Sequence, residues 1–178
     1  GYSDALQDHG ISLDSNLVTD GSEAAMHPDR KDLTVGGEGI WVLFEKRQLR
    51  PQKDVEAVVT VADMTALGAL NALRARGIRI PDDVALVGFD DLEEIQYTRP
   101  PLTTARQSFY EQGWKATEML LAQLHGKPVP DRKSLSMPLI IRRSCGCTDP
   151  LVMQATVEAE QASTSSPLFL NKESFAAR

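Results

Sequence analysis

Two acidic residues have positions in the sequence that suit ligand chemistry. Asp63 follows the apolar residues 57–62, and Asp90 follows the apolar residues 84–89. Such runs are typical of buried parallel strands, and open parallel sheets bind ligands beyond the carboxyl ends of their strands. Carboxylates at that edge accept hydrogen bonds from hydroxyl or amine groups of a small polar ligand. The alternative interpretation makes Asp63 an N-cap and Asp90 part of a turn.

Carboxylates at strand ends can also hold Mg²⁺ for phosphoryl transfer, which would indicate a phosphate-accepting, receiver-like domain or a hydrolase. Such a site needs a further carboxylate on a neighbouring strand end and commonly a lysine. No lysine occupies such a position in this sequence. The receiver-like domain therefore stays an alternative hypothesis.

Other chemical motifs are incomplete. Residues 36–39 read GGEG, but no Gly-Lys-Ser/Thr follows, so we expect a flexible helix entry there instead of a phosphate-binding loop. Cys145 and Cys147 lack the further Cys or His ligands of a structural zinc site. No serine lies in a G-x-S-x-G motif. We therefore expect a protein that is not an enzyme and that needs no cofactor and no metal.

The elements that position Asp63 and Asp90 alternate along the chain. Helix, strand, helix and strand in short order predict an α/β fold with a parallel sheet flanked by helices. One helix presents Ala66, Ala69 and Leu73 on a single face. The expected helices cover residues 2–9, 36–47, 64–76 and 109–124, and the expected strands cover residues 57–62, 84–89, 102–106 and 135–142.

Composition narrows the class of protein. The 178 residues, 42% of them hydrophobic, suit one folded domain and a remainder. A net charge of −6 makes the chain a poor candidate for holding DNA by itself. No apolar run suits a membrane span, no secretion signal is visible, and two cysteines form no disulfide framework. We therefore expect a cytoplasmic protein with no membrane partner.

Four motifs, in one order, resemble a known family. They are ADMTALGA at residues 62–69, GIRIPDDV at 77–84, VGFDD at 87–91 and PPLTTARQ at 100–107. Together they resemble the effector-binding domain of the LacI/GalR family of bacterial transcriptional regulators, which is similar to the periplasmic sugar-binding proteins. The resemblance is dense over these motifs and extends more sparsely over residues 1–147.

The resemblance implies a periplasmic-binding-protein-like type I fold, in which two α/β lobes are joined by crossing strands. This chain would be the C-terminal lobe plus crossing strands, with the first lobe and the DNA-binding helix-turn-helix before Gly1. Residues 102–107 would form a crossing strand, and the helix at 109–124 would belong to the layer of the absent lobe. A homodimer is expected, with DNA bound only through a domain absent from this chain.

The resemblance also assigns ligand contacts. It implies that Asp90, Gln107, Phe109 and Leu33 contact the ligand. Many members of the family have an asparagine where this sequence has Ala62. A sugar ligand would therefore lack one expected hydrogen-bond partner. Asp63 is a further candidate. The resemblance favours a role for it as a helix cap over a role as a ligand contact.

These observations predict that residues 1–147 are the C-terminal part of a ligand-sensing domain and that residues 148–178 are a linker or tail. The expected function is to sense a sugar-like or other small polar effector for a transcriptional regulator. The ending RRSCGC at residues 142–147 resembles sensors fused to a signalling output such as a diguanylate cyclase or kinase, which is an alternative. A binding protein that feeds a transporter is disfavoured by the motif at 100–107.

Overall fold

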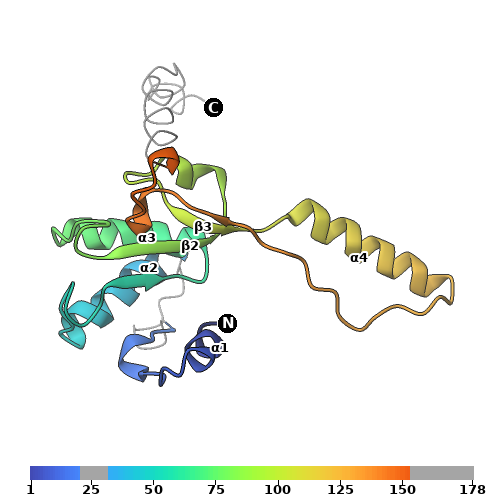
Figure 1. The fold of residues 1–178 in the computed structure, drawn as a ribbon, viewed down its shortest axis with the longest axis horizontal. Coiled ribbons are helices and arrows are strands. Elements are labelled where there is room, and N and C mark those ends of the chain that lie inside the picture. The colour runs from blue at the N-terminus through green and yellow to red at the C-terminus, as the bar shows by residue number, and fades with distance from the viewer. Residues whose placement is uncertain (21–31, 153–178) are drawn as a thin grey trace, which may run out of the picture.

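The computed structural model describes residues 1–20 and 32–152, with the side chains of residues 32–34 left out (Figure 1). Its elements alternate in the order that the sequence predicts. They are α1 (Tyr2–Asp8), η1 (Ser15–Leu17), α2 (Asp32–Trp41), η2 (Val42–Lys46), β1 (Ala57–Val59), α3 (Asp63–Ala75), β2 (Ala85–Asp90), η3 (Glu93–Tyr97), β3 (Thr103–Arg106), α4 (Phe109–Leu124), β4 (Leu139–Ile140) and η4 (Arg143–Cys145).

The four strands form one sheet in the order β1-β2-β3-β4. The β1–β2 and β2–β3 pairs are parallel, and the register places Val58 beside Leu86 and Gly88 beside Thr104. This confirms the α/β fold with a parallel sheet. β4 is shorter than the strand predicted at residues 135–142, and it pairs antiparallel to β3. The chain leaves the sheet after β3 and returns beside it, which reverses the direction of β4 (Figure 1).

Two turns of similar sequence lead into β1 and β2. The backbone N–H and guanidinium of Arg50 bond the carboxylate of Asp54, and those of Arg79 bond Asp83 in the same way. Hydrogen bonds from each arginine lower the pKa of its aspartate to about 2. Gln52 joins the two turns by donating to the carbonyl of Asp82 over 2.7 Å. The two turns therefore help to hold the first parallel strands in register.

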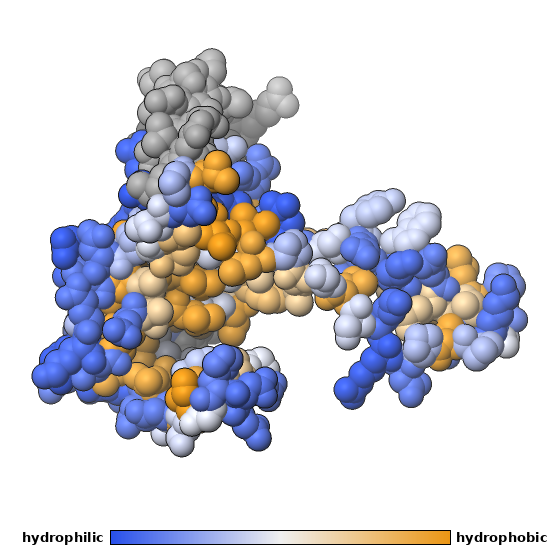
Figure 2. All heavy atoms as spheres, in the orientation of Figure 1, coloured by the Kyte–Doolittle hydropathy of each residue, from blue (hydrophilic) through white to orange (hydrophobic). Residues whose placement is uncertain are grey.

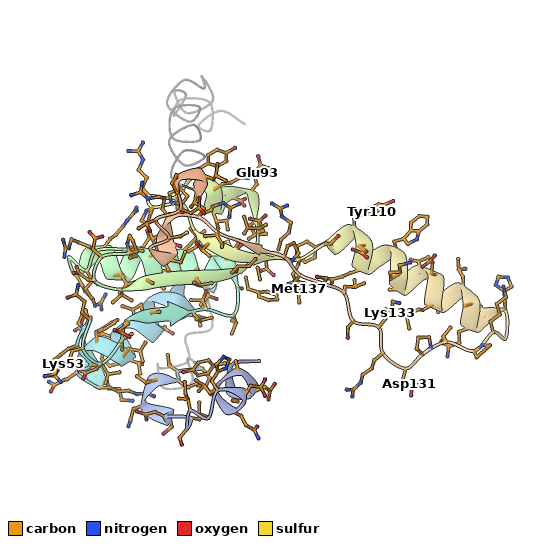
Figure 3. All side chains as sticks on the ribbon, viewed as in Figure 1. Lys53, Glu93, Tyr110, Asp131, Lys133 and Met137 are labelled. Carbon is orange, nitrogen blue, oxygen red and sulfur yellow. The ribbon has the colours of Figure 1, made fainter. Side chains whose placement is uncertain are left out.

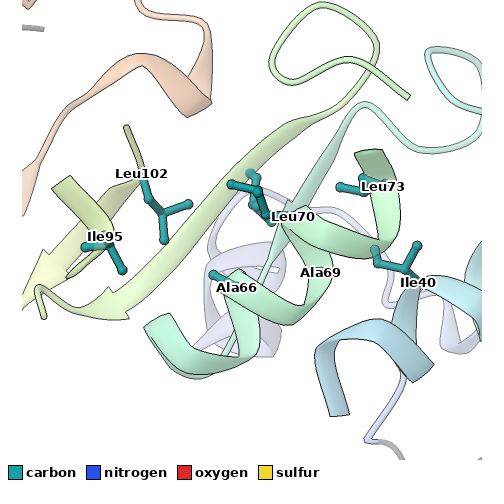
Figure 4. Close-up of a cluster of buried hydrophobic side chains, with 8 residues drawn as sticks. Ile40, Ala66, Ala69, Leu70, Leu73, Ile95 and Leu102 are labelled. Carbon is teal, nitrogen blue, oxygen red and sulfur yellow. The ribbon is translucent and has the colours of Figure 1, made fainter. Parts of the chain in front are cut away.

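The core lies between α3 and one face of the sheet (Figure 4). Leu70 and Leu73 of α3 are buried with Leu86 of β2, because the apolar residues of α3 recur every three or four positions. The full cluster contains Ile40, Ala66, Ala69, Leu70, Leu73, Leu86, Ile95 and Leu102. Val59 points away from this face and is 68% exposed.

Helix α2 packs directly against α3. At Gly36, inside α2, an added Cβ would lie 1.9 Å from the backbone oxygen of Thr65 and 2.7 Å from the nitrogen of Ala69. The expectation of a flexible helix entry at residues 36–39 is therefore wrong. The glycine is needed because the two helix backbones approach too closely for a side chain.

Helix α4 and the segment that follows it, residues 109–138, form an arm that leaves the body of the molecule (Figure 1). No residue of α4 is buried, although the helix carries several large apolar side chains. Figure 2 shows hydrophobic atoms along the arm among hydrophilic ones. In Figure 3, Tyr110 projects outward near the start of α4, and Met137 lies where the returning segment rejoins the body.

Near the end of the described residues, η4 is anchored to the sheet. Ser144 is fully buried, and its hydroxyl accepts from the N–H of Thr103 and donates to the carbonyl of Leu86 over 2.6 Å. The division into a domain at residues 1–147 and a linker or tail at 148–178 stays a prediction, and residues 153–178 lie outside the described residues. None of the helices within residues 1–20 and 32–152 is long and apolar enough to cross a lipid bilayer.

Candidate functional site

Asp90 lies at the carboxyl end of β2, in a sharply turning backbone. Its φ is +118°, and that of Asp91 is +62°. L-residues rarely adopt such angles, and Asp, Asn and Gly do so most readily. Asp90 lies at the edge of the sheet, where it pairs with Arg106 at the end of β3. The predicted position of Asp90 at a strand end is confirmed.

Gln107 follows β3 directly and meets Asp90. Its backbone N–H donates to the carbonyl of Asp90 over 3.2 Å, and its side-chain Nε2 donates to Asp90 Oδ1. Both side chains are half-buried. Among the described residues, no side chain or backbone group donates to Asp90 Oδ2. This oxygen and the second Nε2 hydrogen of Gln107 are an acceptor and a donor at one edge of the sheet.

Asp63 lies beneath this edge and is fully buried. Its Oδ2 accepts from the N–H of Leu92 over 2.8 Å, and its Oδ1 accepts from the hydroxyl of Thr104 over 2.8 Å. Burial raises the pKa of Asp63, although these hydrogen bonds oppose the rise. A Cβ at Gly88 would lie 2.2 Å from Asp63 Oδ1, so the glycine makes room for the carboxylate.

The predicted cap role of Asp63 is wrong. The N-cap of α3 is Ala62, and Asp63 is the first helical residue. Its carboxylate turns to the loop after β2 and to β3, where it accepts from the part-buried N–H of Leu92 and from the buried hydroxyl of Thr104. Its charge still lies near the positive end of the helix dipole. Asp63 thus anchors the loop that follows Asp90, through its bond to the N–H of Leu92.

Asp91 joins the loop after β2 to β3 and to the residues that follow β4. Its carboxylate contacts Arg106 over 2.6 Å and Arg142 over 2.7 Å, and the Asp91 side chain is only 8% exposed. Burial raises the pKa of Asp91, but the hydrogen bonds and charges of Arg142 and Arg106 outweigh burial and hold that pKa below its usual value. Arg142 also donates to the carbonyl of Leu102 over 2.9 Å. Three chain segments therefore meet at one carboxylate.

The other two predicted ligand residues are placed differently. Phe109 is the first residue of α4, two positions after Gln107, and it is 58% exposed. It lines a groove of about 580 Å³ on α4, together with Tyr110, Gly113, Trp114, Thr117, Glu118 and Leu121. Leu33 belongs to α2, but its side chain lies outside the described residues. The structure therefore brings Asp90 and Gln107 together and starts α4 close by.

Residue patterns alone missed three participants. Thr104 of β3 donates to Asp63, Gln112 of α4 donates to Gln107, and Arg142, just before η4, donates to Asp91. The motif at residues 100–107 marks Thr104 as part of a patterned segment, but it does not indicate its partner. Within residues 1–20 and 32–152, no three His, Cys, Asp or Glu side chains are grouped so that they could hold a metal ion.

Comparison with known proteins gives a consistent assignment. The periplasmic binding protein-like domain family matches residues 1–145. The HTH-type transcriptional regulator GalR of Escherichia coli (strain K12) is 33% identical over 151 residues, which are 85% of this chain and 40% of GalR. The chain spans less than half the length of the first curated relatives it matches.

Solved structures agree. The transcriptional repressor AscG of Escherichia coli is 32% identical with a TM-score of 0.63, over 80% of this chain and 47% of AscG. The complex of the transcriptional regulator CelR with cellobiose is 31% identical with a TM-score of 0.66, over 82% of this chain and 40% of CelR. The family match, the relatives and the fold agree with the four sequence motifs. The chain belongs to the periplasmic binding protein-like domain family, as it occurs in regulators of the LacI/GalR type.

Proposed function

We propose that this chain is the C-terminal lobe and crossing strands of a domain that senses a small polar effector for a transcriptional regulator. The observation that carries the proposal is the Asp90–Gln107 pair at the carboxyl edge of a parallel sheet. The relatives are HTH-type regulators, which favours a regulator over a sensor fused to a signalling enzyme. The same relatives support a role in binding and not in catalysis.

The chemistry of the pair suits a sugar-like ligand. Asp90 Oδ2 would accept from a ligand hydroxyl, and the free Nε2 hydrogen of Gln107 would donate to a ligand oxygen. The exposed ring of Phe109 would cover an apolar ring face. A solved structure of CelR is its complex with cellobiose, which supports a saccharide as the ligand class. Leu33 stays a proposed contact, whereas Asp63 has both carboxylate oxygens engaged within the protein and would act by supporting Asp90.

The proposed response is a change in how two lobes close. Asp90 lies on the body, whereas α4 leaves the body and would belong to the layer of a first lobe. A ligand that contacts both sides binds one arrangement more tightly and so favours it. DNA binding through a domain outside this chain, a homodimer and a cytoplasmic location are part of the same proposal. The relatives are HTH-type regulators, which supports the DNA-binding part.

Isothermal titration calorimetry tests the proposal. We expect the protein to bind at least one of cellobiose, maltose and galactose, and not to bind adenine. Asp90→Asn tolerates the positive φ but loses the charge, so affinity should fall by at least ~10-fold, as for a hydrogen bond to a charged group. Glu93→Gln, an exposed acid on η3, is the matched control and should leave affinity unchanged.

Two results would contradict the proposal. Equal affinity of the Asp90→Asn variant and the unaltered protein for the same saccharide would show that the assigned site is wrong. Binding of adenine in place of every saccharide tested would show that the ligand class is wrong.

A further inference from the structure

Helix α4 is tied to the candidate site by a single side chain. Gln112, in the first turns of the helix, donates from Nε2 to Oε1 of Gln107 over 3.0 Å. Among the residues that the structure describes, this is the one side-chain hydrogen bond that joins α4 to a residue beyond its own cap, Ser108. The other side-chain bonds of the helix stay within it, from Lys115 to Glu118 for example.

The amide of Gln107 is therefore held at both ends. Its oxygen accepts from Gln112, and its nitrogen donates to Asp90 Oδ1. The three side chains form a continuous chain from the end of β2, through the residue after β3, to α4. In such a chain each hydrogen bond polarises and orders the next. Without Gln112, the oxygen of Gln107 loses its partner and the amide is held by Asp90 alone.

We propose that Gln112 is a positioning residue that couples the orientation of α4 to the hydrogen bonding of Asp90. When α4 keeps its position, Gln112 fixes the amide of Gln107 and presents one free N–H beside Asp90 Oδ2. When α4 turns away, Gln112 withdraws and the Gln107 amide can leave Asp90. The coupling is reciprocal, so a ligand that engages Asp90 and Gln107 favours the α4 position in which Gln112 is bonded. This inference rests on the proposed ligand site.

The test that decides the inference needs no ligand. In ¹⁵N-labelled protein, the two side-chain N–H signals of Gln107 report its bond to Asp90, and a Gln107→Leu variant assigns them. Gln112→Leu keeps the helix propensity and much of the bulk of the side chain but cannot donate a hydrogen bond. We expect the Gln107 signals to shift and their exchange with water to quicken. Gln123→Leu, an exposed position on the same helix, is the matched control and should leave these signals in place.

A second variant separates hydrogen bonding from packing. In Gln112→Glu, the ionised carboxylate cannot donate to Gln107 Oε1. If the Gln107 amide reversed to donate to that carboxylate, its oxygen would face Asp90, which also cannot donate. The Gln107 signals should therefore differ from those of the unaltered protein at pH 7. They should move back toward them as the introduced carboxyl group is protonated and becomes a donor.

Ligand binding gives a separate measurement. For whichever saccharide the unaltered protein binds, Gln112→Leu should weaken binding by ~2- to 10-fold, the range that one neutral hydrogen bond gives. Unchanged Gln107 signals in Gln112→Leu, or equal shifts in Gln123→Leu, would overturn the inference. A protein that binds no saccharide would count against the proposed function, while the ligand-free signals would still decide the role of Gln112.

Discussion

Helices α3 and α4 both carry an apolar face, yet their surroundings are opposite. In α3, Ala66, Ala69, Leu70 and Leu73 are buried against β2 and its neighbours. In α4, no residue is buried, and the exposed apolar side chains are Phe109, Tyr110, Trp114, Leu120, Leu121 and Leu124. Both helices follow a strand of the same sheet, so position in the topology does not account for the difference.

The contrast between α3 and α4 shows that having an apolar face and having a partner for that face are separate properties of a helix. Spacing shows that a helix has an apolar face, but it does not show what covers that face. The partner of α3 is the next strand along the chain, so local sequence already contains both halves of the interface. The described part of the chain holds no partner for α4, and the relatives are more than twice as long as the matched segment. The apolar side chains of α4 therefore lie at the surface of the described structure.

Truncating one leucine on each helix should give the largest difference. Leu73→Ala removes a fully buried side chain, and such substitutions cost ~2–5 kcal/mol of unfolding free energy. Leu120→Ala, at a position 57% exposed, should change it by less than ~0.5 kcal/mol. Urea denaturation followed by circular dichroism measures both. Similar costs for the two variants would show that α4 is covered in solution and would remove the contrast.

Glycine substitutions extend the same contrast to the backbone. Gly36→Ala places a methyl group against the backbone of α3, so we expect a loss of ~1–3 kcal/mol. Gly113→Ala in α4 meets no atom within 4 Å, and alanine favours helix, so a gain of ~0.5–1 kcal/mol is expected. Thermal and urea unfolding show whether each variant is more or less stable than the unaltered protein. A lower free energy of unfolding for Gly113→Ala would mean that another surface lies against that side of α4.

Asp91 tests the junction between the body and the arm. Asp91→Asn leaves the guanidinium of Arg142, only 14% exposed, without its carboxylate, and we expect a loss of ~1–2 kcal/mol at pH 7. The pKa of Asp91 is lowered in the folded state, so its stabilisation is complete above the unfolded-state pKa, near ~4. It disappears as pH falls through the lower folded-state pKa.

The measurement is the stability difference between Asp91→Asn and the unaltered protein as a function of pH. This difference should shrink as pH falls below ~4. Glu94→Gln, at an exposed acid three residues later, is the control and should show no such change. A difference that stays constant between pH 7 and pH 3 would contradict the assigned ion pairs.

The smallest effect on stability is expected at Trp114. Trp114→Ser should leave the free energy of unfolding within ~0.5 kcal/mol, since the side chain is 57% exposed on the arm. The same variant should bind less of the apolar dye ANS, because it removes the largest ring from the groove on α4. Equal dye fluorescence in the variant and the unaltered protein would show that this groove is not the accessible apolar surface.

Sequence periodicity predicts α4 at 109–124, although the described residues do not cover its apolar face, and it also predicts elements whose partners lie near them in the chain. The helix over α3 and the strands at β1 and β2 belong to this group. Gly36 was misread, because a helix–helix approach depends on α3, some thirty residues later. β4 was predicted too long, because its pairing ends where Arg142 turns to bond Thr103 with its backbone and Asp91 with its side chain.

The candidate site shows the same difference between partners that are near and partners that are far apart in the sequence. The resemblance assigns ligand contacts to both Asp90 and Gln107, and the structure brings these two side chains into contact. The buried role of Asp63 could not be read from its neighbours, because Thr104, its partner, is 41 residues away. Gln112 carries no motif, and only the path of the chain between β3 and α4 places it against Gln107.

The turned backbone at Asp90 has a consequence for altering what such a sensor recognises. With φ at +118°, this position accepts few side chains besides Asp, Asn and Gly. Gln107 and Phe109 follow in ordinary backbone, without this restriction. A directed-evolution library that seeks a new effector should therefore vary residues 107 and 109 and keep residue 90 constant. Under the proposed function, the constant carboxylate would keep one hydroxyl contact while residues 107 and 109 would select the rest of the ligand.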